Sequence, residues 1–128
     1  MRAKHPSDNG RKPPRAVGPY RHTARAAGLV FVSGQIPVDP ATGALVETDI
    51  RAATRQVLAN LAAVLAAENL ALADVVKTTV YLADMGDFAA VNEVYAEAFQ
   101  EPFPARACIQ VAALPKGARI EIEAVARA

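Results

Sequence analysis

The chain has 128 residues, of which 52% are hydrophobic, and a formal net charge of +1. This length suits one domain with its own core, and no apolar run approaches the roughly 20 residues that a membrane-spanning helix needs. The single cysteine excludes an internal disulfide and a thiolate metal cluster. No secretory signal pattern is visible, so we expect a cytoplasmic protein.

Charge is distributed unevenly along the chain. Residues 1–25 carry seven Lys or Arg against one Asp, a net of +6, whereas residues 26–128 carry seven against twelve acidic residues, a net of −5. Because residues 1–16 contain three prolines and an Asn-Gly pair, they predict a flexible basic arm ahead of one domain at 17–128. The arm lacks interleaved aromatic residues, which argues against nucleic-acid binding.

The domain begins with a turn and a strand. Tyr20 follows a Gly-Pro turn, and the apolar run 29–32 predicts a strand that ends at Ser33-Gly34. A glycine at a strand end lets a ligand approach the backbone and leaves N–H groups to donate to it. From the pattern alone, Tyr20 could instead pack its ring on the sheet, and His22 reads as a surface residue without a metal or catalytic role.

Two helices and one strand occupy the middle of the chain. Apolar residues at helical spacing predict a helix over 50–68, and Asp87 predicts the N-cap of a second helix that ends before Pro102. Between them, 73–82 predicts a strand with apolar residues of both parities, which is typical of a strand covered on both faces. Asn92, inside the second helix, reads as a structural residue that binds backbone.

Two strands, 103–111 and 119–125, flank a Pro- and Gly-containing loop at the end of the chain. If the apolar side chains of both strands line the core, Arg106, Cys108 and Glu121 emerge together on the opposite face. A planar cation beside a carboxylate can grip a small acid and perform proton chemistry next to it. An ordinary cross-strand ion pair is the alternative from the pattern alone.

Several short motifs resemble those of the RidA/YjgF family of imine and enamine deaminases. They are Gly18-Pro19-Tyr20, Ser33-Gly34-Gln35, Pro104-Ala105-Arg106 with Cys108, Leu114-Pro115-Lys116, and Ile120-Glu121-Ile122-Glu123. The resemblance implies an α+β, chorismate-mutase-like domain with a mixed sheet and two helices packed on one face. It also implies a homotrimer with sites between subunits. The order of elements agrees, because two helices cover only one face and another copy is the simplest cover for the other.

The resemblance further implies a 2-iminobutanoate/2-iminopropanoate deaminase, which hydrolyses 2-aminoacrylate and related 2-imino acids to 2-keto acids and ammonia. Arg106 and Glu121 would be catalytic, the first clamping the substrate carboxylate and the second activating water. The substrate-binding residues that it implies are Tyr20, Ser33, Gly34, Arg106 and Cys108. No metal, redox cofactor or nucleotide is expected.

Three other interpretations stay open from the sequence. A non-catalytic trimer that binds small carboxylates and regulates a partner would need Arg106 but not Glu121. RNA binding or cleavage finds little support in an acidic body without a basic, aromatic-studded face. Cys108 could be a nucleophile, yet no histidine lies near it in the sequence, so a role through its backbone and packing is favoured.

Overall fold

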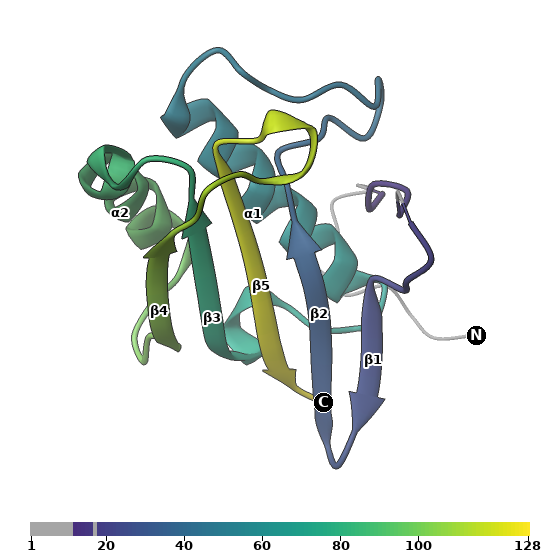
Figure 1. The fold of residues 1–128 in the computed structure, drawn as a ribbon. Helices are drawn as coiled ribbons and strands as arrows, with labels where there is room; N and C mark the ends of the chain where they lie inside the picture. Colours follow the sequence, from purple (N-terminus) through teal and green to yellow (C-terminus); the bar gives the residue numbers. More distant parts are fainter. Residues whose placement is uncertain (1–11, 17) are drawn as a thin grey trace.

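The computed structural model describes residues 12–16 and 18–128 and shows a five-stranded sheet with two helices on one face (Figure 1). The elements are, in chain order, β1 (Thr23–Ala26), β2 (Leu29–Gln35), α1 (Ile50–Ala66), β3 (Val75–Leu82), α2 (Phe88–Ala98), β4 (Ala105–Gln110) and β5 (Ile120–Arg127). The strand order is β1-β2-β5-β3-β4, with β3 and β4 parallel and all other neighbours antiparallel. The predicted α+β architecture is confirmed.

Both helices form where the spacing of apolar residues predicted them. The carboxylate of Asp49 caps α1 by accepting a 2.7 Å hydrogen bond from the N–H of Ala52. Beyond the last turn, Asn69 adopts a left-handed conformation with φ of 61°, so the chain leaves the helix axis there. Asp87 precedes α2 but, contrary to prediction, makes no capping bond; its carboxylate instead accepts two bonds from Arg119 at 3.1 and 3.2 Å.

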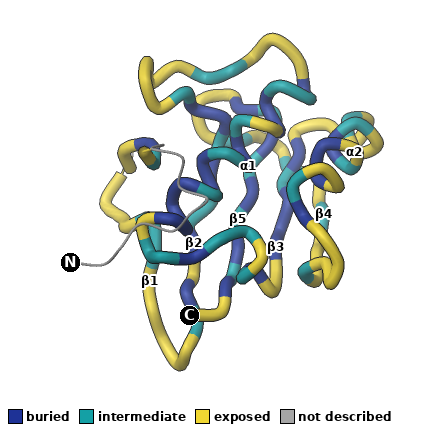
Figure 2. Tube along the Cα trace, turned by 180° about the vertical axis from the view of Figure 1, so that it is seen from behind, coloured by how far each residue is buried: buried dark blue, intermediate teal, exposed yellow. Residues whose placement is uncertain are grey.

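The core lies between the helices and one face of the sheet. The residues that form it are buried and are coloured dark blue along the tube in Figure 2. Alternate residues of β5 face it, as the sequence predicted: Ile120, Ile122, Ala124 and Ala126 are all buried. On β3 a bulge between Val75 and Lys77 resets the alternation. The buried Thr78, Val80 and Leu82 consequently face the helices, and Thr79 and Tyr81 face away.

The other face of the sheet, called the open face below, is not covered by α1 or α2 (Figure 1). Large apolar side chains lie on it: Phe31 of β2 is 44% exposed and Ile109 of β4 is 47% exposed. Phe31 lies opposite Val125 of β5, so this apolar surface extends across neighbouring strands.

The chain before β1 also packs against the domain. Pro14 is buried, and its carbonyl oxygen accepts a hydrogen bond from Nε2 of His22. His22, predicted at the surface, is therefore half-buried and holds the preceding segment. Packing contacts begin at least three residues before the predicted boundary at residue 17, whereas residues 1–11 of the predicted arm lie outside the described part of the chain.

Within residues 12–16 and 18–128, no helix is both long enough and apolar enough to cross a membrane.

Candidate functional site

Arg106 lies on β4, an edge strand, and its side chain points to the helix side of the sheet. Its register partner is the buried Thr78, whose hydroxyl is hydrogen-bonded to the Tyr95 hydroxyl of α2 at 2.8 Å. The guanidinium carbon of Arg106 lies 4.8 Å from the centre of the Tyr95 ring and 5.6 Å from that of Phe88. Such cation–π contacts contribute about 0.5–2 kcal/mol each, and here they place the guanidinium against α2.

Asn92 of α2 completes the support of Arg106. Its side-chain oxygen accepts a 2.8 Å hydrogen bond from Nη1 of Arg106. The expectation that Asn92 binds backbone is therefore wrong: it binds the arginine that was predicted to clamp a carboxylate. Because one nitrogen of the fork is engaged by Asn92, the remaining N–H groups of this exposed side chain are left to meet an incoming carboxylate.

Cys108 lies two residues further along the same face of β4, opposite Val80, and packs against the core. Burial raises the pKa of its thiol, and the positive charge of Arg106 lowers it by a smaller amount. A thiol with a raised pKa is protonated at neutral pH and is a poor nucleophile. The geometry therefore favours the predicted role through backbone and packing.

Glu121 lies on β5 and faces the open face, opposite Tyr81 of β3. Its carboxylate is turned toward β2 and lies against Gly34: a Cβ atom on Gly34 would sit 1.9 Å from Oε2 of Glu121. Gly34 belongs to an irregular stretch of β2, where the register with β5 shifts between Val32 and Gln35. The pKa of Glu121 is raised, mainly by burial and secondarily by the charge of Glu123.

Ser33, next to Gly34, is held by hydrogen bonds to the chain before β1. The Ser33 hydroxyl donates to the carbonyl of Arg21 at 2.7 Å, and the Ser33 N–H donates to the carbonyl of His22 at 2.8 Å. Ser33 thus anchors the entry into β1, and its N–H is not available to a ligand. Tyr20, near the start of the domain, is 43% exposed, and the centre of its ring lies 6.2 Å from the centre of the His22 ring in an edge-to-face arrangement.

The prediction that Arg106, Cys108 and Glu121 emerge on one face of a single chain is wrong. The first two share the helix side of the sheet with Thr78 and Val80, whereas Glu121 lies on the open face. Apolar character alone predicts Ile109 in the core, but Ile109 is exposed. β4 is an edge strand whose faces are set by its parallel register with β3, and that register places Ile109 on the open face.

The contact between Gly34 and Glu121 leads to a prediction. Gly34→Ala should displace the Glu121 carboxylate, because the obstructing atoms are the end of a flexible side chain and the backbone needs no left-handed conformation. We expect a melting temperature close to that of the parent and a turnover in the reaction proposed below reduced by about 100-fold, the order expected when a reacting group is misplaced. Gly86→Ala, near α2, is the matched control. Equal turnover in parent and Gly34→Ala would contradict this placement of Glu121.

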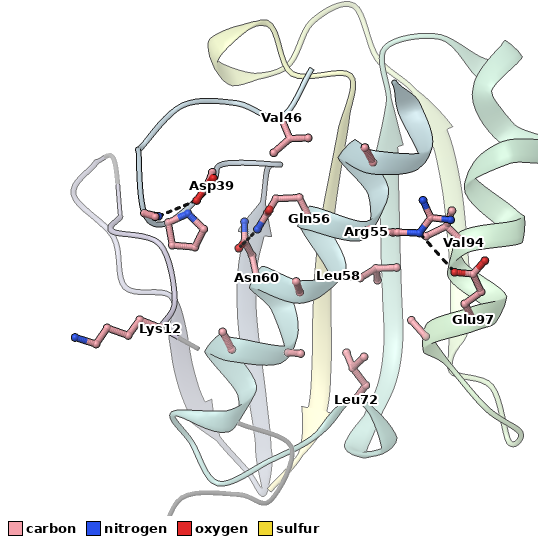
Figure 3. Close-up of a pocket in the computed structure, with 17 residues that line it drawn as sticks. Lys12, Asp39, Val46, Arg55, Gln56, Leu58, Asn60, Leu72, Val94 and Glu97 are labelled. Carbon is pink, nitrogen blue, oxygen red and sulfur yellow. Dashed lines mark hydrogen bonds and ion pairs between the residues drawn. The ribbon is translucent and has the colours of Figure 1, made fainter. Parts of the chain in front are cut away.

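A separate hollow of about 1010 Å³ lies on the outer side of the helices. Figure 3 shows the residues that line it. It is bounded by α1, α2 and the segment before α1, which Asn60 of α1 holds through its bonds to the carbonyls of Ile36 and Val38 at 3.2 and 2.8 Å. Its charged lining includes the exposed pair Arg55–Glu97, with 3.6 Å between Nε and Oε1. None of the predicted site residues lines it, so this hollow is not the candidate site.

The described part of the chain contains no group of side chains suited to bind a metal ion. Among residues 12–16 and 18–128, no three His, Cys, Asp or Glu side chains are grouped so that they could hold an ion.

Comparison with known proteins identifies the family. A family profile described as Endoribonuclease L-PSP matches residues 10–128, nearly the whole chain. The chain belongs to the RidA/YjgF family. The family includes a RutC family protein of Pyrococcus horikoshii, 53% identical over 88% of this chain and 90% of its own. It also includes the human 2-iminobutanoate/2-iminopropanoate deaminase, 50% identical over 90% of this chain and 84% of its own.

Solved structures of the RidA/YjgF family share the fold. The crystal structure of Escherichia coli TdcF with bound serine superposes with a TM-score of 0.86 at 39% identity, covering 100% of this chain and 99% of that one. The described sheet and helices are therefore those of the RidA/YjgF family. The names of its members differ, from deaminase to endoribonuclease.

Proposed function

We propose that this protein is a 2-imino acid deaminase, which hydrolyses 2-aminoacrylate and related imines to 2-keto acids and ammonia. The observation that carries the proposal is the support of Arg106, whose guanidinium is fixed by Asn92 and by two aromatic rings while its side chain stays exposed. A pre-positioned planar fork matches the carboxylate of a small acid. Relatives at about 50% identity that are named as this deaminase support the same activity.

We further propose that the site forms between copies of the chain in a homotrimer. Arg106 and Glu121 point to opposite faces of one sheet, so one chain does not bring them together directly. Arg106 lies on the edge strand β4, and the apolar open face carries Glu121. If the β4 edge of one copy borders the open face of the next, apolar surface is buried and Arg106 of one copy meets Glu121 of the other.

The proposed reaction requires only proton transfers and one water. The enamine first takes a proton on its terminal carbon and becomes the protonated imine, whose carboxylate Arg106 holds. Glu121 removes a proton from water as the water oxygen bonds to the imine carbon and the C=N π electrons move to nitrogen. Glu121 then returns this proton to the nitrogen. Ammonia leaves as the hydroxyl proton is lost and the keto group forms, so the imine and water are converted to a 2-keto acid and ammonia.

The test is to generate 2-aminoacrylate from serine with a dehydratase and follow pyruvate with lactate dehydrogenase. The steady rate is set by the dehydratase, so the informative quantity is the lag before it, during which the intermediate hydrolyses spontaneously. We expect the lag to shorten in proportion to added protein. A lag unchanged at every protein concentration, with pyruvate still bound, would favour a carboxylate-binding regulator over an enzyme.

A further inference from the structure

A second carboxylate, Glu123, lies two residues beyond Glu121 on the same face of β5. Its Oε1 accepts a hydrogen bond from the hydroxyl of Tyr81. Tyr81 is the register partner of Glu121, not of Glu123, so its ring reaches diagonally along the open face. Neither Tyr81 nor Glu123 has a role in the mechanism proposed above.

The two carboxylates are turned in different directions. Glu121 lies against Gly34 of β2, whereas Glu123 is drawn toward β3 by the Tyr81 hydroxyl. The hydrogen bond with Glu123 is the main cause of a raised pKa for Tyr81, so the phenol stays neutral and remains a donor. The Tyr81 hydroxyl thus holds the Glu123 carboxylate on the β3 side of β5, whereas the Glu121 carboxylate lies on the β2 side.

The other charged groups on the described open face have partners of their own or lie away from Glu121. Lys77 of β3 donates to the Thr79 hydroxyl at 2.6 Å, and Arg119, just before β5, is turned to Asp87. Arg127 lies at the opposite end of β5, level with Leu29. The residues that the registers of β1, β2 and β4 place on this face are uncharged: Ala24, Ala26, Leu29, Phe31, Ala105, Ala107 and Ile109.

We propose that Glu123, anchored by the Tyr81 hydroxyl, is a positioning residue that tunes Glu121 as the general base. This inference rests on the proposed function of Glu121. A fixed negative charge beside Glu121 opposes its ionisation, so Glu121 binds a proton more strongly and is the stronger base once ionised. The charge of Glu123 and the burial of Glu121 both raise the pKa of Glu121.

The direction in which the pH profile should move follows from the protonation state in which Glu121 acts. A general base must be unprotonated, so the rate falls as the pH falls through its pKa. In Glu123→Gln one cause of the raised pKa of Glu121 is gone, and the acid limb of kcat/KM should move to lower pH. The plateau at higher pH should fall as well, by less than about tenfold, because Glu121 is then a weaker base.

Carbon-13 NMR of labelled glutamate side chains tests the inference without any activity. The Glu121 signal, assigned by its loss in Glu121→Gln, should titrate at lower pH in Glu123→Gln than in the parent. Glu123→Asp keeps the charge and should restore most of the raised pKa of Glu121. Tyr81→Phe should leave the pKa of Glu121 raised, because the charge stays. Glu97→Gln, on the outer face of α2, removes one negative charge away from the open face and should leave the titration unchanged.

The outcomes separate the two claims. An unchanged Glu121 titration in Glu123→Gln, or an equal fall in Tyr81→Phe, would overturn the role of the Glu123 charge whether or not the protein is a deaminase. A shifted titration in a protein that never shortens the lag would keep the electrostatic coupling and reject the proposed function.

Discussion

Glu121→Gln is expected to lose nearly all turnover while keeping the ability to bind small carboxylates. The amide keeps the size of the side chain and its fit against Gly34 but has no proton-accepting carboxylate. Losing a general base reduces turnover by about 100-fold to 10,000-fold. Pyruvate, the keto acid product, should bind at least as well as to the parent, because a negative charge beside the site has been removed.

The measurements are the lag in the coupled assay and a calorimetric titration with pyruvate. Glu97→Gln is the matched charge control and should behave as the parent in both, since Glu97 is exposed and its ion pair with Arg55 is loose, at 3.6 Å. A parent-like lag in Glu121→Gln would reject the mechanism while leaving the family assignment untouched.

Arg106→Lys is expected to damage binding rather than the proton transfer. Lysine keeps the positive charge but lacks the planar fork that donates to Asn92 and lies over the Tyr95 ring. We expect pyruvate affinity to fall by about tenfold to 100-fold, the value of one hydrogen bond to a charged group. The melting temperature should change little because Arg106 is exposed. Parent-like pyruvate affinity would mean that another group holds the carboxylate.

The same two variants test whether the site is shared between subunits. If each site takes Arg106 from one copy and Glu121 from the next, a mixed trimer of the two variants contains one intact site. Random mixing in equal amounts should then restore about a quarter of the parent activity after co-refolding. Each variant alone, refolded in the same way, is the control. No recovery in trimers shown by light scattering to be mixed would place both residues in one chain's site or reject the site altogether.

Much of the fold could be predicted because it depends on local spacing. The helix around Val57 and Leu61 and the strand alternation of Ile120 and Ile122 follow directly from apolar periodicity, and these side chains are fully buried. The presence of only two helices also predicts a sheet face that a single chain leaves without a helix, as the structure shows. These features need no knowledge of how distant segments pair.

The candidate site was harder to predict because it depends on registers and contacts between distant segments. The bulge after Val75 and the parallel pairing of β4 with β3 decide which face each side chain occupies, and neither is visible in the periodicity. Ile109 is apolar but exposed within one chain, so hydrophobicity predicted the wrong face. The contact of Asn92 with Arg106 spans fourteen residues, although both residues lie in elements that the sequence did predict.

The close approach of the Glu121 carboxylate to Gly34 also limits how this protein can diverge. With Glu121 in place, no L-amino acid with a side chain fits at position 34 without moving the carboxylate, so full activity allows position 34 to change only together with position 121. A shorter acid, as in Glu121→Asp, would withdraw the carboxylate and open room for a methyl group at position 34. In a library that varies both positions, variants selected for activity should therefore show correlated residues at positions 34 and 121. Variants selected only for folding should show the two positions varying independently.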